Sequence, residues 1–175
     1  MLALSNAFDA IREFMERGGD VLFLLLAITF IMWVLIIERL WYLTAEFRAE
    51  RGRVIDAWEA RSERKSWYAH KIRTAMVSEI STNLNSGVQL IKTMVALCPL
   101  VGLLGTVTGM VEVFDVMAFQ GSGNARAMAS GVSKATIPTM AGMVAALSGI
   151  FLSAYIEKKA KTETERLENQ LTMDH

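Results

Sequence analysis

Long uncharged runs alternate with strongly polar stretches along this chain. Residues 21–37, 93–111 and 135–156 contain no Asp, Glu, Lys or Arg. A helix rises about 1.5 Å per residue, so runs of this length can cross a hydrocarbon core of roughly 30 Å, the first only at the lower limit. The pattern therefore predicts an all-α integral membrane protein with three transmembrane helices.

The polar stretches predict further helices outside the membrane. Residues 1–20 carry an apolar residue at every third or fourth position before a glycine pair, which predicts a short amphipathic helix on the membrane surface that ends at the glycines: Leu4, Phe8, Ile11, Met15, Gly18 and Gly19. Residues 38–92 carry charges of both signs at helical spacing and predict a long polar helical region with a turn at 62–66. We expect residues 112–134 to form a connection and residues 157–175 to form a charged tail that continues the last helix.

The distribution of Lys and Arg predicts the orientation of the chain. Ten of these residues fall in 38–92 and four in 157–175, against two in 1–20 and two in 112–134. Basic residues concentrate on the cytoplasmic side of a membrane, and three spans place the two ends on opposite sides. We therefore expect the N-terminus and the connection outside, and the long helical extensions and the C-terminus in the cytoplasm.

The second and third spans differ from lipid anchors because small residues recur along one face of each. Glycines stand at three- and four-residue intervals in the second span and seven residues apart in the third: Gly102, Gly105, Gly109, Gly142 and Gly149. Glycine lets helix backbones approach closely in lipid. These residues predict helix packing, whereas the first span has no such stripe and is expected to face lipid.

Two hydroxyl residues, Thr106 and Thr139, are expected near mid-depth of these spans. One interpretation is tight packing, with each hydroxyl bonded to a carbonyl of its own helix. The other is a polar pore lining, which the prolines at 99 and 138 would favour because each frees a carbonyl that needs a polar partner. The pattern alone leaves both readings open.

The spans contain no carboxylate, amine or imidazole that could take up a proton. Glu112 and Lys134 stand just outside the second and third spans, where they are candidates for accessory groups at a pore mouth. If protons cross this protein, a titratable group must come from another chain, or water must carry them past the hydroxyls. An ionisable group on a partner helix would be costly in lipid and therefore functional.

Composition excludes several other functions. The charge is balanced, 18 basic against 18 acidic residues, and no zinc-finger spacing is present, so nucleic-acid binding has no support. Walker A, HExxH and nucleophile-elbow patterns are also missing, so we expect no enzyme, no cofactor and no metal. The single Cys98 lies in an apolar run and is expected to be a small buried residue.

Two motifs resemble those of the MotA/TolQ/ExbB proton channel family, and most of all its ExbB branch. They are Pro99-Leu100-Val101-Gly102-Leu103-Leu104-Gly105-Thr106-Val107 and Ala135-Thr136-Ile137-Pro138-Thr139-Met140-Ala141-Gly142-Met143-Val144-Ala145-Ala146. The resemblance covers the three-span layout and is most specific over residues 95–156. It implies that Thr106 and Thr139 are the pore threonines of the family.

The resemblance also implies partners and a location. It implies a multi-pass protein of the bacterial inner membrane, with residues 1–20 and 112–134 in the periplasm. The chain would form a homopentamer around two single-span ExbD-like helices, which supply an intramembrane Asp. Proton flow would then drive a TonB-like protein that serves outer-membrane uptake of iron-siderophore complexes or vitamin B12.

This sequence departs from the family at Lys134, where relatives commonly carry Glu five residues before the second threonine. Either that acid is dispensable here or Glu112 serves instead. Two alternative functions also stay open. One is a TolQ- or MotA-like stator subunit with another client, and the other is a membrane scaffold that conducts no ion.

Overall fold

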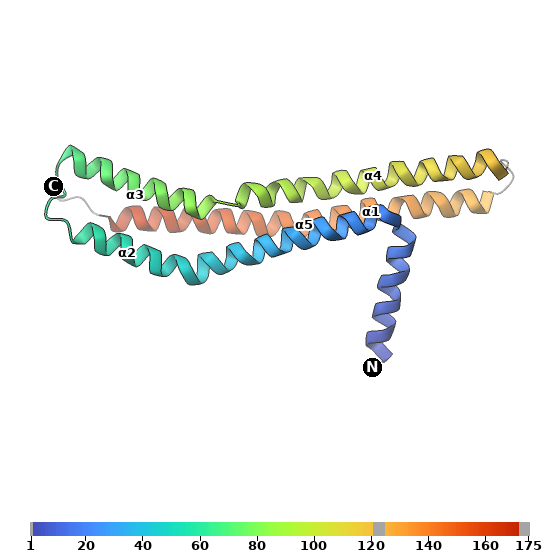
Figure 1. Ribbon diagram of the computed structural model, residues 1–175, viewed down its shortest axis with the longest axis horizontal. Helices are drawn as coiled ribbons and strands as arrows, with labels where there is room; N and C mark the ends of the chain where they lie inside the picture. Colours follow the sequence, from blue (N-terminus) through green and yellow to red (C-terminus); the bar gives the residue numbers. More distant parts are fainter. Residues whose placement is uncertain (1, 121–124, 172–175) are drawn as a thin grey trace. The chain divides into compact units, whose positions relative to one another are not determined.

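The structure is a computed structural model that describes residues 2–120 and 125–171 (Figure 1). Every regular element in these ranges is a helix: α1 (Leu2–Trp41), the π-helix η1 (Tyr42–Glu46), α2 (Phe47–Glu59), α3 (Trp67–Asn85), α4 (Val88–Gln120) and α5 (Ala125–Gln170). Three stretches contain a window long and apolar enough to cross a membrane: Gly19–Glu59, Trp67–Phe119 and Met128–Gln170. The described residues thus confirm the all-α fold with three candidate membrane-spanning helices.

The chain divides into two compact units. The first consists of Met1–Trp33 with Thr93–Ile150, and the second of Val34–Lys92 with Phe151–His175. The first unit is mainly apolar and exposes large side chains such as Phe30, Val107 and Val144. Apolar surface of this extent is what lipid or neighbouring transmembrane helices cover. The second unit contains most of the charged residues.

Helix α1 bends at Gly19, where the backbone leaves helical geometry with φ 67° and ψ −167°. Only glycine adopts such a backbone without strain, because a Cβ would meet the following carbonyl. The glycine pair thus interrupts the helix where the sequence indicated. The side chains of Leu4 and Phe8 lie outside the described residues, and the surface helix over 1–20 stays a prediction.

In the first unit, α4 and α5 both continue beyond the spans that the sequence predicts. Residues 93–111 lie within α4 and residues 135–156 within α5. The segment expected as a connection, 112–134, is helical at 112–120 and 125–134, while 121–124 lie outside the described residues. The described residues of this segment thus extend the two helices.

The second unit has its own core, which includes Trp58, Leu84 and Leu167, each no more than 1% exposed. The turn predicted at 62–66 is present between α2 and α3. Ser66 is the N-cap of α3, and its hydroxyl accepts a hydrogen bond from the amide of Ala69 at 3.2 Å. Caps of this kind satisfy an amide that the first helical turn leaves unbonded.

Helices α3 and α4 are separated at Gly87, which has φ 75°. The guanidinium of Arg39 occupies the space where a side chain would be, since a Cβ at Gly87 would lie 2.9 Å from Arg39 Nε. Arg39 Nη1 also donates to the carbonyl of Asn83 at 3.4 Å. Arg39, near the C-terminal end of α1, therefore holds the break between α3 and α4 in place.

We expect Gly87→Ala to lower the free energy of unfolding by about 1–2 kcal/mol, the cost of a left-handed backbone for a residue with a Cβ. Gly52→Ala is the matched control, because Gly52 lies in α2 with nothing within 4 Å of its Cβ position. That control should be neutral or stabilise by up to about 1 kcal/mol. Thermal unfolding of the detergent-solubilised protein measures both, and equal melting temperatures would contradict the strain at Gly87.

Tyr42 begins the π-helix, outside the predicted spans, and donates its hydroxyl hydrogen to Glu50 Oε2 at 2.6 Å. Glu50 Oε1 accepts a second bond, from the side-chain Nδ2 of Asn83 at 3.3 Å. The pKa of Tyr42 is raised to about 12, and burial of the phenol is the largest cause. The hydrogen bond to Glu50 and the negative charge of that carboxylate raise the pKa further. Glu50 thus connects η1, α2 and α3 within the second unit.

The stabilising effect of Tyr42 should be present below pH 10, the ordinary pKa of tyrosine, and lost as the pH rises through about 12, because only the unfolded chain ionises in between. In a titration of phenolate absorbance, Tyr42→Phe should remove the step at highest pH. Tyr68→Phe is the control, since Tyr68 is 72% exposed and should leave that step in place. If the titration step at highest pH remains in Tyr42→Phe, that step does not belong to Tyr42.

Candidate functional site

The glycines of α4 and α5 lie where the two helices cross most closely. A Cβ at Gly142 would lie 2.5 Å from the backbone oxygen of Cys98, and one at Gly102 would lie 2.8 Å from the oxygen of Pro138. A Cβ at Gly109 would lie 2.6 Å from the Cβ of Ala135. Contacts this short leave no room for a larger side chain, so at these positions glycine sets how near the helices can come.

Glycines 105 and 149 lie next to side chains of α1. A Cβ at Gly105 would lie 2.5 Å from Pro138 Cβ and 3.1 Å from Val21 Cγ1. One at Gly149 would lie 2.5 Å from Val95 Cγ2 and 2.6 Å from the sulfur of Met32, which is fully buried. The first span, which the sequence predicted to face lipid, therefore also packs one of its faces against the other two.

Thr106 and Thr139 meet at the α4–α5 crossing. Their hydroxyl oxygens are within hydrogen-bonding distance of each other. Thr139 Oγ1 donates across to the carbonyl oxygen of Gly102 at 2.9 Å, while Thr106 Oγ1 lies 3.4 Å from the same oxygen. Both side chains are half-buried. The two predicted pore residues thus form one polar pair, and Gly102 supplies a carbonyl that they share.

The hydrogen bonds of this pair have a preferred direction. Each hydroxyl has one hydrogen to donate and two lone pairs that accept. If Thr139 donates to the Gly102 carbonyl, the shorter of the two contacts, then Thr106 donates to the oxygen of Thr139. This arrangement leaves the Thr106 oxygen free to accept a hydrogen bond from outside the chain. Rotation about the Cβ–Oγ1 bond of Thr106 would instead let this hydroxyl donate a hydrogen bond to a group outside the chain.

Sequence reasoning missed the Gly102 carbonyl as the centre of the site. It assigned each hydroxyl, in the packing interpretation, to a carbonyl of its own helix. Thr108 follows that expectation, with bonds of 3.1 Å to the carbonyls of Leu104 and Gly105. Thr139 does not, because it bonds to the opposite helix. No local sequence feature indicated this bond, which depends on the packing of Pro138 and Thr139 against Gly102 and Gly105.

Glu112 and Lys134 are not part of the threonine pair. Both side chains are exposed, and within the described ranges neither forms an ion pair. Glu112 follows Thr106 by six residues and Lys134 precedes Thr139 by five, which places each roughly 8–9 Å further along its helix. Glu112 and Lys134 stay candidates for accessory groups at a pore mouth, away from the threonine pair.

The crossing has hydroxyls and a carbonyl but no acid or base of its own. In 2–120 and 125–171 no group of three or more His, Cys, Asp or Glu side chains could hold a metal ion. Threonine hydroxyls do not ionise near neutral pH, so this site can orient a proton-carrying group and bond to it but cannot hold the proton.

We expect Gly142→Ala to destabilise the protein by about 1–3 kcal/mol, because the added methyl group meets a backbone oxygen of α4 that moves only if the helices separate. Thermal unfolding in detergent, with Gly52→Ala as the same substitution at an open position, measures the difference. Equal stability of the two variants would contradict close packing at this crossing.

Curated relatives are similar to parts of this chain. A putative biopolymer transport protein ExbB-like 1 of Synechocystis is 40% identical over 72 residues, which cover 39% of this chain and 28% of the relative. The biopolymer transport protein ExbB of Xanthomonas campestris is 35% identical over 95 residues, 54% of this chain and 37% of the relative. A putative ExbB homolog of Methanothermobacter thermautotrophicus is 24% identical over 93% of this chain and 68% of the relative. The chain thus matches about a third of the length of the first two.

The family model for the MotA/TolQ/ExbB proton channel family matches residues 45–169, well over half of the chain. That range includes α4 and α5 with the threonine pair between them. The three membrane-length apolar helices agree with a multi-pass membrane protein. The chain belongs to the MotA/TolQ/ExbB proton channel family.

Proposed function

We propose that this chain is the proton-channel subunit of an inner-membrane motor that uses the proton motive force to drive TonB-dependent transport across the outer membrane. The observation that carries the proposal is the pairing of Thr106 with Thr139 at the Gly102 carbonyl, within spans that contain no acid. The family and the names of the relatives support it.

The proton carrier in this proposal is an intramembrane Asp on an ExbD-like single-span partner. A carboxylic acid donates one hydrogen bond, and the open lone pairs of Thr106 can accept it. A carboxylate accepts only, and the rotated hydroxyl can then donate to it. The pair can therefore bond to both charge states of the same acid, which lowers the cost of an ionisable group within the membrane.

Neutralisation of that acid would weaken its bond to the hydroxyls and free the partner helix to rotate or shift against the surrounding helices. One charge that moves through 100 mV releases about 2.3 kcal/mol, comparable to one or two hydrogen bonds to a charged group. The present chain would act as the stator. A TonB-like protein would pass the motion to receptors for iron-siderophore complexes or vitamin B12.

The proposed assembly is a homopentamer around two partner helices, with the N-terminus outside and the C-terminus in the cytoplasm. The exposed apolar side chains of the first unit support contacts with lipid or further copies, among them Phe30, Leu103 and Leu147. The excess of Lys and Arg in 38–92 and 157–175 supports the orientation.

A non-conducting scaffold is the second candidate, and one observation favours it. Both hydroxyls of the threonine pair have partners within the chain, so packing alone could account for them. A TolQ- or MotA-like subunit would share the chemistry and differ in its client. The relatives are named as biopolymer transport proteins, which supports a transport client for this chain.

We expect the double variant Thr106→Val, Thr139→Val to keep its oligomeric state and to lose roughly tenfold or more of its proton flux, because valine matches the shape of threonine but cannot bond to the partner acid. Flux into proteoliposomes that hold the purified complex measures this loss. Thr106→Ser, Thr139→Ser keeps both hydroxyls and should retain most of the flux.

Thr108→Val is the matched control, because among the described residues the Thr108 hydroxyl bonds only within α4, and its loss should leave the flux unchanged. A double valine variant that assembles and conducts like the original protein would support the scaffold and contradict the channel. Native mass spectrometry of the same samples checks the subunit count of the assembly.

A further inference from the structure

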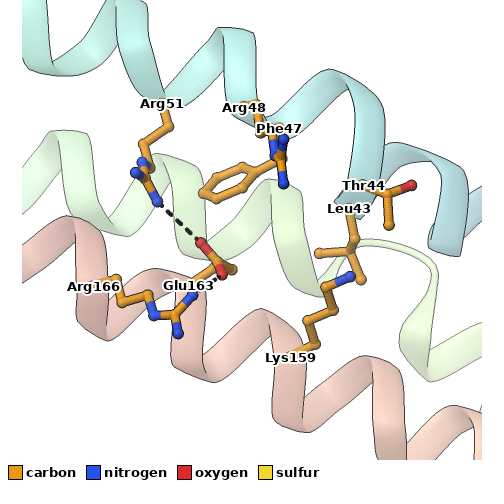
Figure 2. Close-up of a pocket in the computed structure, with 8 residues that line it drawn as sticks. All are labelled: Leu43, Thr44, Phe47, Arg48, Arg51, Lys159, Glu163 and Arg166. Carbon is orange, nitrogen blue, oxygen red and sulfur yellow. Dashed lines mark hydrogen bonds and ion pairs between the residues drawn. The ribbon is translucent and has the colours of Figure 1, made fainter.

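A basic pocket opens in the second unit between η1–α2 and α5 (Figure 2). Its volume is about 490 Å³, within the usual range for small-molecule sites. We call it the basic pocket and define it by its lining residues: Leu43, Thr44, Phe47, Arg48, Arg51, Lys159, Glu163 and Arg166. Four of these carry a positive charge and one a negative charge, so the pocket has an excess of three positive charges.

The single carboxylate of the pocket positions two of its arginines. Arg51 Nη1 donates to Glu163 Oε2 at 3.3 Å, and Arg166 Nη1 donates to Glu163 Oε1 at 2.8 Å. Glu163 is only 14% exposed, and Figure 2 shows it between the two guanidinium groups. A guanidinium has five N–H donors, and these bonds use one of each. Each guanidinium keeps further N–H donors, and guanidinium groups bind phosphate oxygens well.

Arg48 and Lys159 supply two of the three excess positive charges. Neither forms an ion pair among the residues that the structure describes. In Figure 2 they come from opposite helices, Arg48 from α2 and Lys159 from α5, and Lys159 extends toward Leu43. Like charges placed on facing helices repel each other unless an anion lies between them. The pocket therefore suits a phosphate ester.

The position along the chain favours a phosphate that belongs to a lipid. Lys159 follows the third predicted span by three residues, Leu43 follows the first by six and Arg48 follows it by eleven, so the pocket extends from roughly 5 Å to roughly 16 Å beyond the spans along the helices. The end of the pocket nearest the spans therefore falls at the depth expected for the headgroup layer. Among the lining residues that follow the first span, Leu43 and Thr44 are nearest to it, and they would meet a glycerol backbone. Basic clusters next to a transmembrane helix bind anionic lipids.

We propose that the basic pocket binds the phosphate headgroup of an anionic phospholipid, with Arg48 and Lys159 as the main contacts of the phosphate and Arg51 and Arg166 held in place by Glu163. The site lies outside the threonine pair and does not depend on proton conduction. One lipid would bind to each copy of the chain.

The test measures lipid binding to the purified full-length complex by native mass spectrometry, with phosphatidylglycerol and phosphatidylcholine as probes. We expect phosphatidylglycerol to bind and Arg48→Gln, Lys159→Gln to weaken it by roughly twentyfold to thirtyfold, because one basic residue near an anionic surface contributes about a factor of five. Phosphatidylcholine binding should be weak in both proteins.

The matched control is Arg53→Gln, Lys158→Gln, which removes the same charge from the same two helices outside the basic pocket, at exposed positions with no ion pair among the described residues. This control should bind phosphatidylglycerol within about twofold of the original protein. An equal loss in both variants would indicate unspecific surface charge and overturn the proposal, as would no loss in either.

Two further results would also overturn it. Competition by millimolar inorganic phosphate would assign the pocket to a free phosphate instead of a lipid headgroup. A change in subunit count for Arg48→Gln, Lys159→Gln, without loss of lipid, would assign the pocket to contacts between copies of the chain.

Discussion

The close approach of α4 and α5 is the constraint on which the first unit depends. Their backbones come so near at Gly102 and Gly142 that an added Cβ would meet an oxygen of the other helix. Without a hydrophobic driving force between helices in lipid, contact of this kind and hydrogen bonds between helices are what hold them together. The same proximity brings the Thr139 hydroxyl to the Gly102 carbonyl. Packing and polar chemistry therefore share one set of residues.

The local features of the fold could be predicted from the sequence because each depends on a few neighbouring residues. The uncharged runs indicated the helices, the glycine at 19 marked the bend in α1, and the polar residues up to Ser66 marked the turn before α3. Proline and glycine act through backbone geometry that the sequence shows directly. The helix ends were less predictable, since α4 and α5 continue well past the apolar runs.

The geometry of the sites needed the structure because it depends on which faces of distant helices meet. The pairing of Thr106 with Thr139 depends on the register between two antiparallel helices, as does the bond to the Gly102 carbonyl. The basic pocket depends in the same way on the faces of α2 and α5 that meet at Arg51 and Glu163. A charge pattern with both signs mixed along each helix gave no indication that the positive side chains would gather in one place.

The absence of any acid from the three spans has a consequence for how such a complex could adapt. Under the proposed function, the pKa of the partner's carboxyl group sets the pH range over which the motor runs, because threonine hydroxyls do not ionise in that range. A change in the partner alone could retune that range while this chain stayed the same. One ring could then serve several partners, each suited to a different external acidity.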